Sequence, residues 1–291
     1  MSLELRERDL GQLLAQIFSF AADQFGRLFI LQVLAGLPVL AAQLILQPGV
    51  GFEGLRFDGD PEALIPVVAA FYGKLLAVAL VAALLYPLEL AAAALLVQRL
   101  VDGQPADLPA CLRGALRRWP RCLMLTVTLG VMVTVGSMCC IAPGIIFSIW
   151  FFVAVPAFVI EDRPWTGAFG RSRALVGGLS AGGRFLEVLV VYLLTTFAPG
   201  MVLAPVFMAL TLVPSPSAQM ILQQALGMLA GVLVLAAAPL VYFHLRVARE
   251  AYDLQRIAAL VDVIGSQAGG AQAGGAQAGG AQAEQADRDP A

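Results

Sequence analysis

Long apolar stretches separated by short polar segments occupy the chain from residue 28 to residue 245. A helix needs about 20 mostly apolar residues to cross the roughly 30 Å hydrocarbon core of a bilayer. Only helices satisfy their own backbone hydrogen bonds within one such segment. The pattern therefore predicts an all-α, polytopic integral membrane bundle of about six transmembrane helices, with spans at residues 28–46, 75–96, 122–140, 145–160, 185–212 and 220–245.

Three further segments carry apolar residues on one helical face only. Over residues 9–25 the apolar positions repeat with the i, i+3, i+4, i+7 spacing of an amphipathic helix, which predicts a helix in the membrane interface. Residues 108–119 and 165–176, in the connections after the second and fourth spans, show the same spacing. We expect these two to be short amphipathic helices on the inner membrane surface.

Proline and glycine mark the expected irregular positions. Pro87 is expected to kink the second span, because proline lacks a backbone donor. The pair 143–144 predicts a tight turn between the third and fourth spans, and the pair 199–200 predicts a break in the fifth. The sequence therefore predicts a membrane domain over residues 1–264 and a disordered tail of QAGGA repeats over 265–291. We expect the spans themselves, and not a cleavable signal peptide, to direct insertion into the membrane.

The positions of the arginines predict the orientation. They cluster before the first span, in the connections after the second and fourth spans, and after the sixth, whereas the opposite loops carry Arg56 alone. By the positive-inside rule both termini are cytoplasmic, which requires an even number of spans. The abundance of Arg over Lys, with much Ala and Gly, is typical of a GC-rich bacterium, so we expect a multi-pass protein of the inner (plasma) membrane.

Composition excludes several classes of function. The 291 residues are 59% hydrophobic and 13% charged with a net charge of −2, so no basic field attracts nucleic acid. The four cysteines and one histidine fit no metal motif, and the adjacent Cys139 and Cys140 are expected to pack as small apolar residues. No phosphate-binding loop or nucleophile motif is present either. We therefore expect no cofactor and no enzymatic activity.

Glu89 is the charged residue that stands out most, since it follows Pro87 inside the second span. An ionised carboxylate in hydrocarbon costs at least a few kcal/mol unless it finds a partner. Two interpretations remain open: a proton or substrate site, or a structural hydrogen bond to backbone freed by the proline. Lys74 is expected to extend to the headgroups at the outer end of the same span.

Further charged residues gather where the spans meet the inner surface. Arg184 and Glu187 have the spacing of an i, i+3 ion pair, and His244 is expected at the interface. The other inner-face residues form either a docking surface for anionic headgroups or a protein partner, or a set of structural salt bridges. The candidate functional residues among them are Glu161, Arg171, Arg173, Arg246 and Glu250.

Two stretches resemble a known bacterial family. They are the segment from Ala142 to Gly177, with its APGII, Val155-Pro156, Glu161 and RSRALVG sequences, and the segment from Tyr242 to Leu254. Together they are similar to the membrane domain fused to some glycerophosphoryl diester phosphodiesterases and to its stand-alone relatives, over about residues 8–260. The chain departs from that pattern at His244, usually an acid, and at Ala251, commonly glycine. The resemblance implies a multi-span helical domain without the catalytic barrel.

These observations predict a non-catalytic membrane domain that contacts the lipid bilayer. Its cytoplasmic face is expected to scaffold a membrane or cytoplasmic protein partner or to engage anionic lipid headgroups. The alternative is a small transporter or lipid-translocating protein that uses the buried Glu89, because kinked and discontinuous helices often line binding sites.

Overall fold

The computed structural model describes residues 9–46, 64–177 and 184–250, and every regular element in these ranges is a helix. Six helical segments are long and apolar enough to cross a membrane, which confirms the predicted all-α class and the number of spans. The helices are α1 (Leu10–Asp23), α2 (Phe25–Ile45), α3 (Leu64–Val101), α4 (Leu108–Cys139), α5 (Ile141–Trp150), α6 (Ala154–Glu161), α7 (Trp165–Val176), α8 (Phe185–Thr196), α9 (Ala198–Leu210) and α10 (Pro216–Glu250).

The chain forms two compact units, residues 1–245 and residues 246–291. The boundary falls within α10, so the described part of the second unit is the end of that helix. There Arg246 and Glu250 form an i, i+4 ion pair, with Nε and Oε2 3.4 Å apart. The charged ends of these two candidate residues therefore engage each other.

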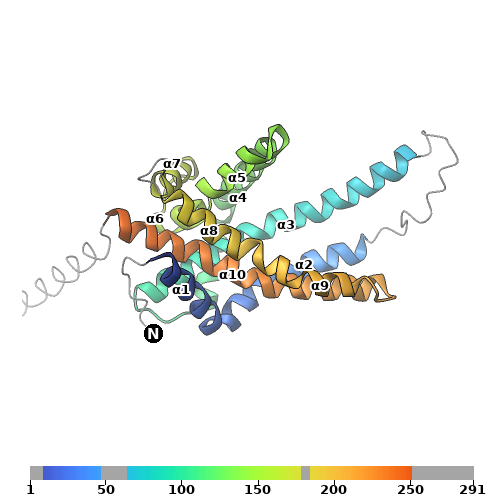
Figure 1. Ribbon diagram of the computed structural model, residues 1–291, viewed down its shortest axis with the longest axis horizontal. Helices are drawn as coiled ribbons and strands as arrows, with labels where there is room; N and C mark the ends of the chain where they lie inside the picture. The colour runs from blue at the N-terminus through green and yellow to red at the C-terminus, as the bar shows by residue number, and fades with distance from the viewer. Residues whose placement is uncertain (1–8, 47–63, 178–183, 251–291) are drawn as a thin grey trace, which may run out of the picture. The chain divides into compact units, whose positions relative to one another are not determined.

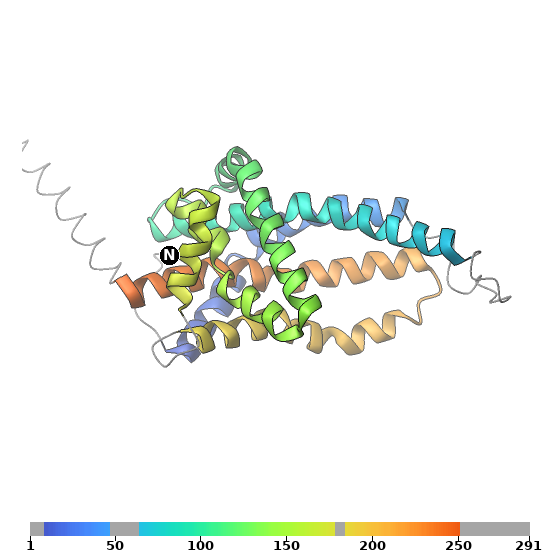
Figure 2. The same cartoon turned by 90° about the horizontal axis from the view of Figure 1, so that it is seen from above.

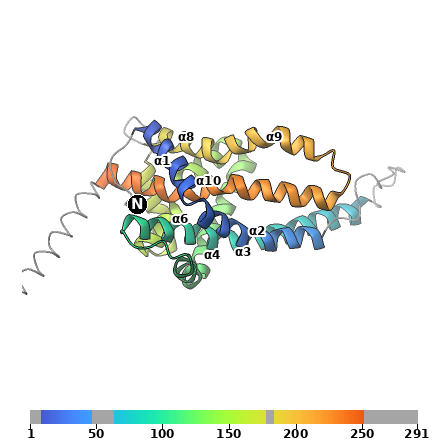
Figure 3. The ribbon, with the colours of Figure 1, turned by 90° about the horizontal axis from the view of Figure 1, so that it is seen from below.

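Within the first unit, α1, α7 and the α3–α4 connection lie at one end of the bundle (Figure 1), which we call the arginine-rich end. The end of α2, the start of α3 and the α9–α10 connection lie at the opposite end (Figures 1 and 2). Figure 3 shows α9 and α10 running antiparallel and joined there by a short connection. The arginine-bearing segments of this unit are thus brought together, as a common orientation in the membrane requires.

Small residues form the tightest part of the core. The alanines at 91–94 of α3 and 236–238 of α10 are at most 3% exposed. Small side chains let membrane helices approach closely, so that van der Waals contact between backbones replaces the hydrophobic effect that lipid cannot supply. The bundle is therefore packed most closely in the half next to the arginine-rich end.

The backbone of α3 around Pro87 receives hydrogen bonds from α4. The Trp119 indole Nε1 donates to the Leu84 carbonyl at 2.7 Å, and the Cys122 thiol donates to the Pro87 carbonyl at 3.5 Å. Both are additional hydrogen bonds from α4 to backbone carbonyls of α3 close to Pro87. The indole of Trp119 is therefore directed at a neighbouring helix.

We predicted a tight turn between the third and fourth spans at Pro143–Gly144, and the turn lies before these residues instead. α4 ends at Cys139, and Cys140 adopts an extended conformation that lets α5 begin at Ile141. Proline is tolerated in the first turn of a helix, where its missing N–H has no intrahelical acceptor. A Cβ on Gly144 would overlap the side chain of Ser137, so this glycine permits close approach of α4 and α5.

The same turn places Cys139 and Cys140 in the open. Both are exposed, whereas we expected them to be packed in a helix; Cys111 and Cys122 are buried. The prediction was wrong because it extended the third span to residue 140 and missed that the helix reverses there.

Several helices extend beyond or divide the expected spans. α3 and α4 begin at Leu64 and Leu108, ahead of the segments expected to cross the membrane, so the predicted surface helix 108–119 is the first part of α4. The fifth span divides into α8 and α9 at Phe197, just before Pro199. A helix can protrude from the hydrocarbon, so the limits of the spans themselves stay predictions. The polar helix expected beyond Glu250 and the repeat tail lie outside the described residues.

Part of the amphipathic face of α1 and of α7 is buried by the protein itself. In α1 the buried residues are Leu13, Ile17, Phe20 and Ala21, and in α7 they are Ala168, Ser172, Leu175 and Val176. We had expected both helices to lie on the lipid surface. The bundle covers part of each apolar face, whereas Phe18 of α1 is 49% exposed, and the expected place of both helices at the membrane surface stays a prediction.

Candidate functional site

The charged residues of the arginine-rich end fall into two groups, those held by partners and those that project from the surface. The most elaborate of the first group is the Glu161 cluster, which comprises Glu161, Arg163, Arg171 and Tyr242. Arg171 Nε lies 2.7 and 3.0 Å from the two carboxylate oxygens of Glu161, and the Tyr242 hydroxyl donates to Oε1 at 2.7 Å. Arg163 Nε also donates to this carboxylate.

The Glu161 cluster joins three helices at one point. Glu161 ends α6, and the left-handed conformation of Asp162 (φ 48°) turns the chain into the segment that carries Arg163. Arg171 comes from α7, and Tyr242, fully buried, comes from α10. A carboxylate that accepts from two guanidiniums and one hydroxyl has its lone pairs occupied. The arrangement therefore fixes α6, α7 and α10 together.

A second cluster joins α8 to α10. Arg184 Nη1 lies 3.0 Å from Glu187 Oε2, which confirms the predicted i, i+3 ion pair. His244 Nε2 lies 2.7 Å from Glu187 Oε1. His244 is 5% exposed and packs inside the bundle against this carboxylate, while its expected depth at the membrane interface stays a prediction.

Arg173 and Arg118 also have partners. The Arg173 guanidinium carbon lies 4.9 Å from the centre of the Trp150 ring, a cation–π distance. Arg118 Nε lies 3.3 Å from Asp162. Three candidates from the sequence, Glu161, Arg171 and Arg173, are thus engaged within the protein, and so is Arg118.

Three arginines of α4 differ from these. Arg113, Arg117 and Arg121, which we call the arginine stripe, are exposed and have no hydrogen bond or ion pair with any described residue. Their i, i+4, i+8 spacing sets them along one side of the helix. Leu116, between Arg113 and Arg117 in the sequence, and Met124, after Arg121, also have exposed side chains. The sequence identified these arginines only as an orientation signal, and the structure distinguishes them by their lack of partners.

Glu89 lies inside the bundle at 7% exposure. Its partner is the side chain of Gln32 on α2, which hydrogen-bonds to the carboxylate. The amide of Gln32 in turn packs against Gly231 of α10. The backbone near Pro87 receives its hydrogen bonds from Trp119 and Cys122 instead, so the structural contact expected for Glu89 has a different partner.

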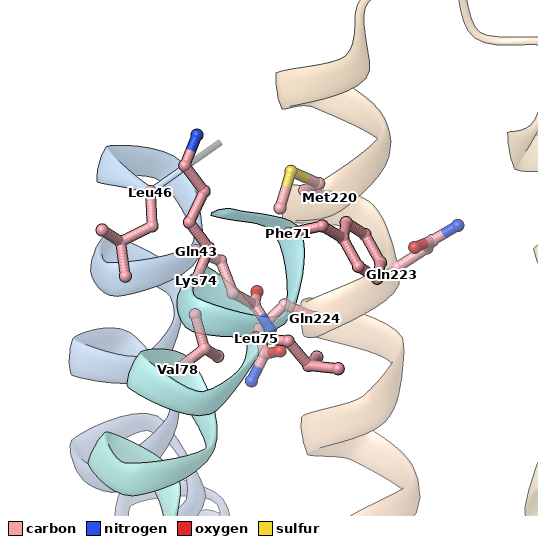
Figure 4. A pocket seen from close by; sticks show the side chains of 9 residues that line it. All are labelled: Gln43, Leu46, Phe71, Lys74, Leu75, Val78, Met220, Gln223 and Gln224. Carbon is pink, nitrogen blue, oxygen red and sulfur yellow. The ribbon is translucent and has the colours of Figure 1, made fainter. Parts of the chain in front are cut away.

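A pocket of about 350 Å³ lies between α2, α3 and α10 near the opposite end, as Figure 4 shows. We call it the glutamine pocket. Half-buried polar side chains and apolar ones both line it: Gln43, Leu46, Phe71, Lys74, Leu75, Val78, Met220, Gln223 and Gln224. The sequence singled out only Lys74 in this region. The glutamines gave no signal, because the helix pairing that assembles them is not visible in the sequence.

A larger cavity of about 830 Å³ lies among α3, α4, α5, α8 and α10. Its lining is mainly valine, leucine, alanine and phenylalanine, with the hydroxyls of Tyr86, Thr126 and Tyr192 among them. The α4–α5 hairpin diverges from the far half of α3 (Figures 1 and 2). A cavity of this character among membrane-spanning helices is suited to contact with lipid chains.

Among the described residues, no three or more His, Cys, Asp and Glu side chains are grouped to hold a metal ion. No protein-family model matches the chain, and comparison with curated proteins and with solved structures gave no match. The function is therefore argued from the geometry alone.

Proposed function

We propose that this protein is a non-catalytic integral membrane domain whose arginine-rich end engages anionic lipid headgroups at the cytoplasmic face of a bacterial plasma membrane. The observation that carries the proposal is the arginine stripe of Arg113, Arg117 and Arg121. Its guanidiniums are exposed and have no partner among the described residues. Arginine suits this role because its planar fork donates two hydrogen bonds to one phosphate.

The position of the stripe along α4 supports a contact with headgroups. From Arg121 to the end of α4 at Cys139 the helix is about 27 Å long, close to the roughly 30 Å of a hydrocarbon core. Exposed apolar side chains follow along this part: Met124, Val127, Val131, Val135 and Met138. The surface of α4 therefore changes from basic to apolar about where it would enter the hydrocarbon.

The arginines that have partners differ in role from the arginine stripe. Arg171, Arg173 and Arg118 stabilise contacts between helices, and a guanidinium so engaged has fewer donors left for a ligand. The proposal thus assigns lipid engagement to the stripe and a structural role to the Glu161 cluster. The same end also provides a surface for a protein partner, but no described feature selects one.

The resemblance to the membrane domain of glycerophosphoryl diester phosphodiesterases is compatible with this reading, and we propose that the chain is related to it. The two resembling stretches meet in the Glu161 cluster, through Glu161 and Arg171 from the first and Tyr242 from the second. Residues that pair in this way are expected to recur together for structural reasons.

A small transporter is the second candidate, and the burial of Glu89 favours it. A carboxylate at 7% exposure in a membrane-spanning helix, with one amide partner, is expensive to maintain unless it serves folding or a substrate. Flux that is lost in Glu89→Gln would support this function; a flux that is unaffected would argue against it.

Lipid counting tests the main proposal. The protein is reconstituted in nanodiscs with equal phosphatidylglycerol and phosphatidylcholine, transferred to detergent, and the retained lipids are identified by native mass spectrometry. Each basic residue near an anionic surface contributes about 1 kcal/mol, or roughly fivefold in affinity. We expect Arg117→Gln to lower the preference for phosphatidylglycerol by about that factor, and the triple Gln variant of the stripe to abolish it.

Arg118→Gln is the matched control, because Arg118 is the next residue along α4 but pairs with Asp162. It should retain the preference, as should a triple Lys variant that keeps the positive charges. A triple Gln variant that still enriches phosphatidylglycerol as the wild type does would refute the proposal.

A further inference from the structure

The cavity among α3, α4, α5, α8 and α10, which we call the hydroxyl cavity, contains hydroxyl groups and no charge. Among the described residues that line it, none has an acidic, basic or imidazole side chain. Its volume of about 830 Å³ falls in the range of small-molecule sites, which are mostly apolar with a few placed polar groups and often lie between helices of a bundle. Its size and lining therefore suit an uncharged ligand.

Two of the hydroxyls that line the cavity lack a partner in the protein. Thr126 and Ser148 donate to carbonyls of their own helices, at 3.1 and 2.9 Å. The hydroxyls of Tyr86 and Tyr192, by contrast, form no hydrogen bond with any residue of the described ranges. A hydroxyl without a hydrogen bond is unfavourable in hydrocarbon, where no water replaces the missing partner. Both phenols are therefore donors for an acceptor that the ligand supplies.

The depth of Tyr86 indicates where that acceptor lies. Tyr86 is at the middle of the predicted second span, residues 75–96, and thus about 15 Å along the helix from either end. Tyrosines of the aromatic belts lie at the headgroup level, so a belt position does not account for this side chain. The ester carbonyls of glycerolipids also lie near the headgroups. The acceptor is therefore expected on a molecule whose polar group enters the hydrocarbon core.

Aromatic rings surround the two phenols. Tyr192 of α8 packs edge to face against Phe152, with ring centres 5.6 Å apart. Tyr86 of α3 is close enough to Tyr192 for the two phenol groups to interact electrostatically. Phe151 lines the same cavity. Since aromatic side chains pack favourably against other flat π-systems, these residues complement a planar ring that carries hydrogen-bond acceptors.

The hydroxyl cavity opens towards the lipid. Leu76, Leu80, Val131 and Val135 line it, and each is at least 54% exposed. The α4–α5 hairpin diverges from the far half of α3 on this side, as Figures 1 and 2 show. A hydrocarbon chain can therefore lie along these aliphatic side chains and continue into the bilayer.

We propose that the hydroxyl cavity binds an isoprenoid quinone, whose ring carbonyls accept hydrogen bonds from Tyr86 and Tyr192 and whose chain lies along the leucines and valines of α3 and α4. A quinone is uncharged, which suits a lining without charge, and the carboxylate of Glu89 near Tyr86 would disfavour an anion. Because the site is separate from the arginine stripe, a negative result here would leave the lipid contact of the stripe unaffected.

Photo-crosslinking tests the proposal. The protein in phosphatidylcholine nanodiscs is irradiated with an azidoquinone that carries a short isoprenoid chain, and the labelled peptides are identified by mass spectrometry. Decylubiquinone and dioctanoylglycerol are the competitors, since both are uncharged lipids with carbonyl groups but only the first has a planar ring. We expect labels on the cavity-lining parts of α3 and α4, and we expect decylubiquinone, and not dioctanoylglycerol, to reduce them.

Two pairs of variants test whether the label reports the cavity. A Cβ at Gly130, which lines the cavity, or at Gly227, which does not, would meet nothing within 4 Å. Gly130→Phe should therefore fill the cavity and abolish labelling, whereas Gly227→Phe should retain it. Tyr86→Phe removes one donor and should raise the half-maximal concentration of decylubiquinone about three- to tenfold. Tyr72→Phe, at an exposed position of α3 outside the cavity, should leave it unchanged.

The outcomes separate a quinone site from a general lipid contact. Equal competition by dioctanoylglycerol and decylubiquinone would show that the ring is not recognised and would overturn the assignment. Labelling that spares the cavity peptides, or that persists in Gly130→Phe, would overturn the site itself. Equal half-maximal concentrations for Tyr86→Phe and Tyr72→Phe would contradict the role of the phenol.

Discussion

Replacing Tyr242 with phenylalanine removes one hydroxyl from the Glu161 cluster and leaves the ring in place. That hydroxyl donates to Glu161 Oε1 at 2.7 Å, and the Glu161 side chain is 10% exposed. A hydrogen bond to a charged group contributes about 1.5–3 kcal/mol. Glu161→Gln is expected to lower the free energy of unfolding by more, about 3–5 kcal/mol, because it removes the negative charge that the Arg171 guanidinium, itself 15% exposed, contacts.

Buried thiols provide the readout of unfolding. Cys111 and Cys122 are buried, so a fluorogenic maleimide reacts with them as the protein unfolds on heating, and alanine at Cys139 and Cys140 removes the exposed thiols. At about 2–4 °C per kcal/mol, Tyr242→Phe should lower the midpoint by about 3–12 °C. The control is Tyr192→Phe, which removes a hydroxyl that has no hydrogen bond with any described residue and should leave the midpoint unchanged.

The double variant separates this contact from general damage. In a Glu161→Gln background the carboxylate is absent, so Tyr242→Phe should lower the unfolding midpoint much less than it does in the wild type. Full additivity of the two substitutions, or a Tyr242→Phe midpoint equal to that of the Tyr192 control, would refute the view that the hydroxyl and the carboxylate act as one unit.

Three further predictions concern packing and orientation. Glu89→Gln should fold with an unchanged midpoint, because an amide can still pair with its glutamine partner, whereas Glu89→Leu should lower the midpoint by removing that partner. Gly144→Ala should lower the midpoint, since its Cβ would overlap a serine of α4, but Gly130→Ala, where nothing lies within 4 Å, should raise it slightly; equal effects would contradict the packing argument. A membrane-impermeant maleimide added outside spheroplasts should label Cys139 and Cys140; labelling from the cytoplasmic side alone would contradict the proposed orientation.

Periodicity predicted the elements of this fold well, because both the spans and the amphipathic faces are local properties. The buried face of α7, with Ala168 and Leu175, is the face that its apolar spacing indicates. The same reasoning failed at the turn before α5. Pro143 and Gly144 have the composition of a turn, yet each serves a helix, Pro143 as a first-turn residue and Gly144 as a point of close contact.

The site was less predictable because its contacts join distant parts of the chain. Glu161 and Tyr242 are 81 residues apart, and no spacing rule brings them together. The i, i+3 pair of Arg184 and Glu187 was found in advance, whereas the approach of His244 to the same carboxylate was not. Sequence reasoning recognised which residues are charged at the membrane edge, and only the fold separates those with partners from the arginine stripe.

These contacts give the two halves of the bundle different mechanical properties. Near the arginine-rich end, alanines of α3 and α10 are buried in the core, and the Glu161 cluster joins α10 to α6 and α7. Near the opposite end, Gln43, Lys74 and Gln224 line the glutamine pocket, and the side chain of Met228 lies beside Gly36. Close packing resists small displacements, whereas a flexible methionine can change rotamer at little cost. The half of the bundle near the opposite end should therefore deform more easily than the half next to the arginine-rich end.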